Sequence, residues 1–110
     1  MKRFSIILLL LATTLVASCQ PRPIKALIVS VQNNHNWKVS HLVLQKILNN
    51  STLFKADIVL TPAAGEDMST FTPNFSAYDV VVLDYNGDRW PAETDAAFLR
   101  CPQPWFFLQY

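Results

Sequence analysis

The chain has 110 residues, of which 51% are hydrophobic and 15% are charged. This length allows one small domain, and an apolar content this high, with seven Phe, excludes a disordered chain. Nine basic and eight acidic side chains give a net charge of +1, so no strong positive field directs the chain to nucleic acid, and two Cys are too few for a disulfide framework.

Residues 1–18 have the pattern of a signal peptide. Lys2 and Arg3 are followed by an apolar run from Phe4 to Val16, which is too short for a bilayer core that needs about 20 residues but fits a signal-peptide core. The four residues Val-Ala-Ser-Cys, from Val16 to Cys19, resemble the lipobox of bacterial lipoproteins. The resemblance implies cleavage before Cys19 and lipidation of its sulfur. The alternative is an ordinary secretory signal cut near Ser18, with Cys19 unmodified.

A lipidated Cys19 would place the protein in the bacterial cell envelope, anchored in a membrane and facing the periplasm. Residues 19–23 then form a tether, which the two prolines around Arg22 make stiff and extended. Cys101 would remain as a lone thiol. It has no base nearby in sequence and no nucleophile elbow around it, so we expect a surface or frayed thiol and not a nucleophile.

The first half of the remaining chain predicts a strand followed by a helix. Residues 25–31 form a run rich in β-branched residues without polar alternation, typical of a strand buried on both faces of a parallel sheet. Asn36 is expected to cap a helix over residues 37–49. The apolar positions of this helix fall near one side, which predicts that this side packs on the sheet; they are Val39, Leu42, Val43, Ile47 and Leu48.

The second half predicts two more strands and a second helix. Residues 54–60 alternate partly, residues 66–77 are mixed and mostly loop, and residues 78–84 are the strongest strand pattern in the chain. Pro91 suits the start of a helix over residues 92–100. Short connections and right-handed crossovers then predict a doubly wound α/β start with strand order 2-1-3 and helices on both faces.

In such a sheet, ligands bind beyond the carboxyl ends of the strands where the strand order reverses. That places the loop over residues 32–37 beside the loop over residues 85–90. Both loops are rich in amides and carboxylates and both end in Trp, a combination that fits a sugar-like ligand. The alternative is that the Asn residues cap turns and helices while the Trp residues hold the loops to the core.

Single residues in this region carry different expectations. His35 is a candidate general base or metal ligand, whereas His41 should lie on the outer side of the helix. The two have no recognised metal spacing, so we predict no metal site. Asp84, at a strand end, either orients a turn or faces a ligand. Two Gly in the whole chain exclude a Gly-rich phosphate loop, and no cofactor is predicted.

Two sequence blocks resemble ThuA-like (trehalose-utilisation) domains. They are Lys-Ala-Leu-Ile-Val…Gln-Asn-Asn-His-Asn-Trp-Lys, from residue 25, and Phe-Ser-Ala-Tyr-Asp-Val-Val-Val-Leu-Asp-Tyr-Asn-Gly-Asp-Arg-Trp-Pro, from residue 75. The resemblance covers about residues 24–100. It implies a flavodoxin-like fold related to class I glutamine amidotransferases, without their catalytic Cys, and an association with sugar utilisation. Exported forms of the family occur with keto-sugar-processing domains.

The resemblance also implies a carbohydrate pocket built partly from Asn34, His35, Asn86 and Asp88. We expect His35 and Asp88 to be catalytic residues. We expect a small saccharide to be bound by the remaining side chains of the two loops, namely Asn34, Trp37, Asn86 and Trp90.

The chain departs from the family after Arg100. Family members continue into a Gly-rich turn, another core strand and a His-Ala-Ala-like segment, whereas residues 101–110 contain two prolines and no Gly. We therefore expect a truncated or frameshifted form with only three strands, low stability, and an open apolar strand edge at residues 78–83. Three functions stay open: a lipid-anchored sugar-processing domain, a non-catalytic saccharide-binding module, and an inactive fragment.

Overall fold

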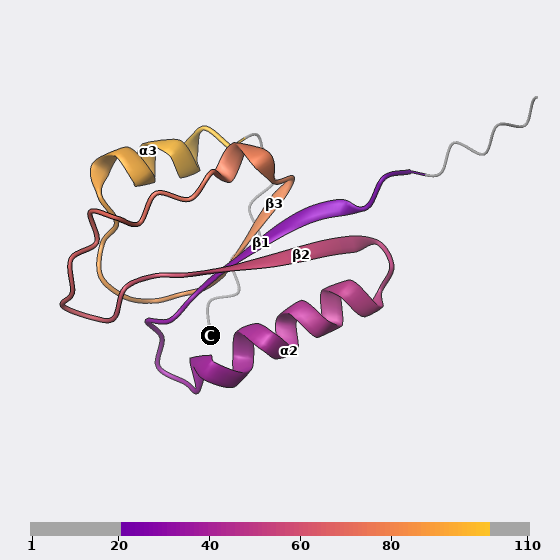
Figure 1. The fold of residues 1–110 in the computed structure, drawn as a ribbon, viewed down its shortest axis with the longest axis horizontal. Coiled ribbons are helices and arrows are strands. Elements are labelled where there is room, and N and C mark those ends of the chain that lie inside the picture. The colour runs from indigo at the N-terminus through magenta and orange to yellow at the C-terminus, as the bar shows by residue number, and fades with distance from the viewer. Residues whose placement is uncertain (1–20, 102–110) are drawn as a thin grey trace, which may run out of the picture.

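The computed structural model describes residues 21–101, which form a three-stranded sheet between two helices (Figure 1). The predicted signal peptide, the lipidation site Cys19 and residues 102–110 of the tail lie outside the described residues. In chain order the elements are β1 (Ile24–Ser30), α2 (Trp37–Asn50), β2 (Phe54–Leu60), a short 3-10 helix η2 (Phe75–Ala77), β3 (Val80–Asp84) and α3 (Ala92–Leu99).

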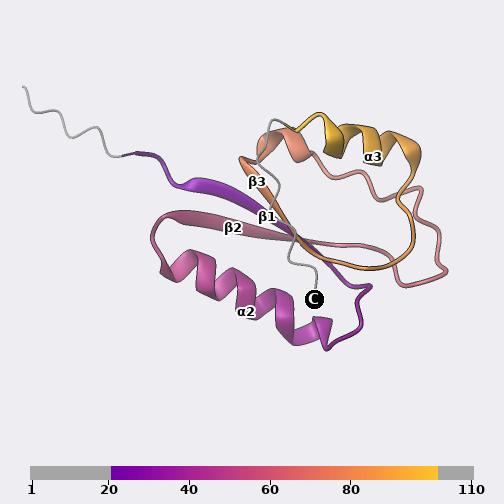
Figure 2. The same ribbon diagram turned by 180° about the vertical axis from the view of Figure 1, so that it is seen from behind.

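All strand pairs are parallel and the strand order is β2-β1-β3, which confirms the predicted α/β architecture and order. The central strand β1 is the most deeply buried of the three, and its residues from Ala26 to Ser30 are all buried. Figures 1 and 2 show α2 and α3 on opposite faces of the sheet. Because parallel strands need such crossovers, the two helices follow directly from the order of the strands.

Element boundaries differ from the predicted ones by small local effects. The third strand begins at Val80 instead of Tyr78, because the amide of Tyr78 donates to the carbonyl oxygen of Phe75 and closes η2. Asn36 does occupy the N-cap of α2, but its side chain makes no capping bond. Its backbone carbonyl oxygen accepts the amide of Ser40 instead.

The face of the sheet under α3 is packed with aromatic rings. Trp90 is buried and its ring lies 5.3–5.7 Å from those of Phe71, Phe75, Phe98 and Tyr85. The same cluster includes Leu27, Val29, Val81 and Cys101.

Cys101 is therefore not the surface or frayed thiol that we expected. It is 5% exposed, and its Sγ lies 3.4 Å from the carbonyl oxygen of Phe75. Burial raises the pKa of the thiol, which keeps it protonated and unreactive at neutral pH. The burial of Cys101 results from tertiary packing, because residue 101 follows the end of α3 and lies in the aromatic cluster.

The face under α2 is packed more thinly. Its buried core consists of Ala26, Ile28 and Ala56, with Leu44 and Leu48 of the helix packed against it. The prediction for the helix face was largely wrong: of the five apolar residues expected to pack, only Leu48 does. The other four are between 48% and 60% exposed; they are Val39, Leu42, Val43 and Ile47.

Polar contacts fix this rotation of α2. The Ser40 hydroxyl donates to the Asp84 carboxylate at 2.6 Å, and the Gln45 amide donates to the carbonyl oxygen of Ala56 at 2.9 Å. The Asn49 side chain accepts the amide of Ala56 at 2.8 Å. These contacts hold both ends of the helix, so its packed side is the one that carries polar anchors.

The same rotation turns His41 inward, against the expectation of an outer position. His41 is 7% exposed, its Nδ1–H donates to the carbonyl oxygen of Trp37, and its ring stacks on the indole at 5.7 Å between centroids. His41 is therefore a packed structural residue. Among residues 21–101, no helix is both long and apolar enough to cross a bilayer.

At the amino ends of the strands, Arg22 forms a two-pronged ion pair with Asp79, with N···O distances of 2.6 and 2.7 Å. The amide of Lys25 also donates to Asp79, at 2.9 Å. These bonds hold the pKa of Asp79 well below its usual range, with the Arg22 guanidinium as the main cause. They connect the segment before β1 to the start of β3.

Candidate functional site

The site forms where β1 and β3 end side by side. Their last residues, Ser30 and Asp84, are register partners, so two polar side chains meet at the carboxyl edge of an otherwise apolar pair of strands. The Asp84 side chain is only 4% exposed. Its carboxylate accepts the hydroxyls of Ser30 and Ser40 at 2.8 and 2.6 Å and the Asn33 amide at 3.1 Å. A buried carboxylate is stable here because every side of it is hydrogen-bonded.

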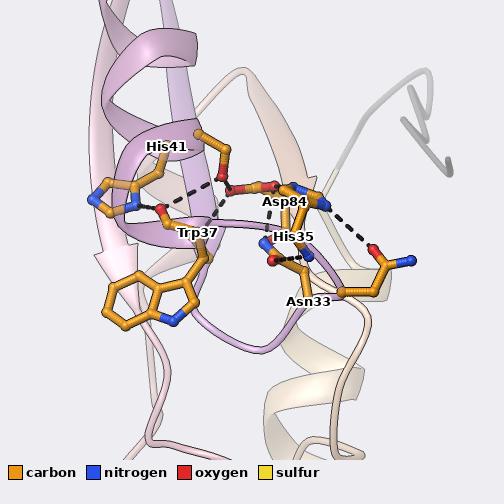
Figure 3. A network of polar contacts seen from close by, with 8 residues as sticks. Asn33, His35, Trp37, His41 and Asp84 are labelled. Atoms are coloured by element: carbon orange, nitrogen blue, oxygen red, sulfur yellow. Dashed lines mark hydrogen bonds and ion pairs between the residues drawn. The ribbon is translucent and has the colours of Figure 1, made fainter.

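His35 completes the cluster around this carboxylate (Figure 3). Its Nε2 lies 2.9 Å from Asp84 Oδ1, so the ring donates its Nε2–H to the carboxylate. In the neutral ring this leaves Nδ1 as the basic nitrogen. Nδ1 lies 3.2 Å from the side-chain oxygen of Asn34, which is an acceptor, so this contact is a hydrogen bond only when Nδ1 also carries a proton. In the neutral ring Nδ1 is left without a donor from Asn34, and the His35 side chain is 46% exposed. The imidazole is thus held from inside and accessible from outside.

The turn that presents His35 begins with a strained residue. Val31 follows β1 directly and has φ 133°, a value that a β-branched residue adopts only at a cost of about 1–3 kcal/mol. This conformation turns the chain out of the sheet, so that the residues after it run along the carboxyl edge. The backbone amide of His35 then donates to the side-chain oxygen of Asn33 at 3.2 Å, which closes the turn.

Gln32 links the loops that follow all three strands. Its amide donates to the carbonyl oxygen of Pro62, after β2, at 2.9 Å. Its side-chain oxygen accepts the amide of Asp88 at 2.7 Å, and its backbone oxygen accepts the amide of Asn86 at 2.6 Å. A Cβ added at Gly87 would overlap Cβ and Oε1 of Gln32, so the absence of a side chain at residue 87 is what allows this approach.

A groove of about 470 Å³ opens beside His35, between the start of α2 and the end of β3. Both polar and apolar side chains line it. It is lined by Asn33, Asn34, His35, Asn36, Val39, Ser40, Val43, Leu44, Leu83, Asp84, Tyr85 and Asn86. The predicted meeting of the two loops is therefore observed.

The six predicted site residues divide into two groups. Asn34, His35 and Asn86 line the groove. Asp88 does not face His35: its carboxylate accepts the amide of Gly65 at 2.7 Å, and its carbonyl oxygen accepts the Tyr85 hydroxyl. Trp90 is buried in the aromatic cluster, and Trp37 stacks on His41. The structure thus gives Asp88, Trp37 and Trp90 packing and loop contacts away from the groove lining.

Sequence reasoning gave too little weight to Asp84 and overlooked its partners Ser30 and Ser40. The signal for the pair was incomplete, because the predicted strand over residues 78–84 ends in Asp84, whereas the predicted strand over residues 25–31 ends in Val31, one residue after Ser30. Ser40 lies one turn into α2, so its contact depends on the helix rotation and has no sequence signal. Among residues 21–101, no group of three or more His, Cys, Asp and Glu side chains is arranged to hold a metal ion.

A solved structure is similar to this chain. It is the 1.75 Å crystal structure of a protein from Parabacteroides merdae ATCC 43184, described by name as ThuA-like, with 58% sequence identity and a TM-score of 0.68. The match covers 71% of this chain and 28% of that chain, so this chain spans less than a third of the length of the similar protein. No protein-family model and no curated protein matches the chain. The likeness supports the predicted ThuA-like resemblance, and the sheet and helices match part of a flavodoxin-like fold.

Proposed function

We propose that this chain is a ThuA-like domain protein of sugar utilisation and that it binds a saccharide in the groove beside His35. The observation that carries the proposal is the contact between His35 and the buried Asp84, at 2.9 Å, on the wall of a groove rich in amides. The likeness to the Parabacteroides merdae protein supports the family part of the proposal.

The geometry suits His35 to proton transfer. Asp84 holds the ring through Nε2–H and would stabilise a positive charge on the imidazole, while Nδ1 faces the accessible side. A substrate hydroxyl that reaches Nδ1 would replace the contact with Asn34. Asp84 acts through His35 in this arrangement, so it is a positioning residue and His35 is the base.

The amides around His35 suit a polyol ligand. An Asn side chain offers both a donor and an acceptor, as does each sugar hydroxyl, so Asn34, Asn36 and Asn86 can each bond a hydroxyl in either sense. Neither Lys nor Arg lines the groove in the described part of the chain. The recognition chemistry on this wall is therefore hydrogen bonding.

The anchor is a separate part of the proposal. We infer that Cys19 is lipidated and holds the protein in the cell envelope, on the strength of the Val-Ala-Ser-Cys motif after an apolar run. Mass spectrometry of the protein purified from membranes tests this directly. A mass increase of acyl chains on a peptide that begins at Cys19 supports the anchor, and an unmodified Cys19 contradicts it.

Calorimetric titration of the full chain with trehalose and with keto sugars tests the site. Asn34→Ala removes one hydrogen-bonding group and should weaken binding by about 2- to 10-fold, since one neutral hydrogen bond contributes about 0.5–1.5 kcal/mol. Asp84→Asn should weaken it further, because it disturbs the whole cluster. The matched control is Asn50→Ala, at the far end of α2, which should bind as the parent does.

The same titrations separate the functions that remained open. Saccharide binding with a product that disappears in His35→Gln indicates an enzyme, and saturable binding without a product indicates a binding module. Binding that is unchanged in both His35→Gln and Asp84→Asn would contradict the proposed site. A folded parent chain that binds none of the sugars would contradict the proposed function.

A further inference from the structure

The segment before β1 leaves the domain at the end opposite to the groove. Figure 1 shows residues 21–23 continuing away from the amino end of β1, whereas the groove lies beyond its carboxyl end. Arg22 is held there by the ion pair with Asp79, and Pro21 and Pro23 restrict the backbone on both sides of it. The direction in which the segment leaves is therefore fixed by side-chain and backbone constraints together.

The charges of the described residues divide along the same axis. Parallel strands share their amino end, where α2 and α3 also finish, so the charged residues can be divided between the two ends, with Asp57 of mid-β2 counted at the amino end. The amino end carries five cations and two acids: Arg22, Lys25, Lys46, Lys55 and Arg100, with Asp57 and Asp79. The carboxyl end carries two cations and six acids: Lys38 and Arg89, with Glu66, Asp67, Asp84, Asp88, Glu93 and Asp95.

We propose that the amino end of the sheet is a membrane-facing surface, which rests on an anionic lipid bilayer and holds the saccharide groove away from it. This rests on the proposed anchor at Cys19. The positive end matches anionic headgroups in charge and the negative end is repelled by them, so electrostatics and the fixed exit of the segment favour one orientation.

The anchor segment is short compared with the distance from Arg22 to the groove. Arg22 follows Cys19 by three positions, and three Cα–Cα steps span at most about 11 Å. The seven residues of β1 separate the Arg22 end from the groove by about 20 Å. The anchor is thus shorter than the domain, and with the amino end on the bilayer the groove lies about 20 Å farther from the lipid than Arg22 does. The site accordingly takes water-soluble saccharides and not the headgroups of glycolipids in the same membrane.

Fluorescence quenching on vesicles tests this orientation. The lipidated full chain carries a thiol-reactive dye at Asn50→Cys, at the amino end, or at Ala64→Cys, at the carboxyl end; both positions are exposed and Cys101 is buried. The vesicles contain phosphatidylcholine, phosphatidylglycerol and a lipid with a nitroxide on its headgroup. We expect the dye at residue 50 to be quenched severalfold more than the dye at residue 64.

Arg22→Gln breaks the ion pair and should reduce the difference in quenching between the two labels, while the remaining charge asymmetry keeps the dye at residue 50 the more strongly quenched. The matched control, Arg89→Gln, removes an equal charge at the other end and should leave the difference intact. Equal quenching in the parent chain overturns the orientation alone. A difference that is undiminished in Arg22→Gln overturns the role of the ion pair. A chain that does not float with the vesicles overturns both anchor and orientation, and the saccharide titrations stay independent of all three results.

Discussion

The two faces of the sheet are packed unequally. Under α3, the aromatic rings around Trp90 and Phe75 are closed over by η2 and the end of α3, and even Cys101 is buried. Under α2, the buried core is two alanines and Ile28, while Val43 and Ile47 of the helix are about half exposed. The groove lies on this second side, between α2 and the end of β3.

The difference separates stability from function. The face under α3 holds the fold together with large apolar contacts. The face under α2 is held by hydrogen bonds at its two ends, which leaves room for a ligand beside them. Substitutions on the two faces should therefore differ in their effects on the free energy of unfolding and on saccharide binding. Four predictions test this difference.

The largest effect is expected at Phe75, one of the most completely buried side chains. Phe75→Ala leaves a cavity in the aromatic cluster and should lower the free energy of unfolding by about 3–5 kcal/mol, measured by urea denaturation followed by circular dichroism. A domain this small has little stability to lose, so we expect the variant to be largely unfolded without urea. A loss below about 1 kcal/mol would show that the aromatic cluster does not dominate the fold.

Gly87→Ala should have the next largest effect. The added methyl group meets Gln32, whose side chain is fixed by the loops after β2 and β3, and overpacking of this kind costs about 1–3 kcal/mol. Saccharide binding should weaken as well, because the rim of the groove shifts. The control is Gly65→Ala, where φ is +78° and no atom lies within 4 Å of the added Cβ. It should strain the backbone without affecting binding.

Acid should lower the stability of the amino end of the sheet through Asp79. This residue connects Arg22 and the start of β1 to the segment after η2. Its pKa is lowered in the folded state, so its contribution to the free energy of unfolding is complete well above the unfolded value of about 3.9 and is lost as the pH falls below it. Thermal unfolding from pH 7 to pH 3 should show this loss in the parent chain and a flatter profile in Asp79→Asn. Identical profiles would show that the ion pair does not contribute to the stability of this end of the sheet.

The smallest effect is expected on the open side of α2. Ile47 is 60% exposed, so Ile47→Gln should change the free energy of unfolding by no more than about 0.5 kcal/mol. The same urea titration provides the measurement. A large loss of stability would mean that this surface is covered in solution and that the two faces are more alike than their described packing indicates.

Much of the fold could be predicted because it depends on local patterns. The run over residues 25–31 and the partly alternating segment over residues 54–60 predicted two of the strands, and the alternation of strands and helices predicted the order 2-1-3. The packed face of α2 could not be predicted from apolar spacing, because Ser40 and Gln45 fix it through polar contacts to other elements.

The site was predicted in place but not in detail. The meeting of the two loops follows from topology, and His35 was identified as a candidate base. The partner of His35 is Asp84, at a strand end, whereas Asp88, four residues later, bonds Gly65. Sequence spacing treats the two carboxylates alike, and only the register of Ser30 with Asp84 distinguishes them.

The close approach of Gln32 to Gly87 also constrains how this sequence can diverge. A side chain can be accepted at residue 87 only if the one at residue 32 becomes smaller or moves, so substitutions at the two positions are expected to occur together. A descendant that changes one of them alone passes through a less fit intermediate. The pair should therefore appear as a correlated change among homologous sequences, although its members are 55 positions apart in the chain.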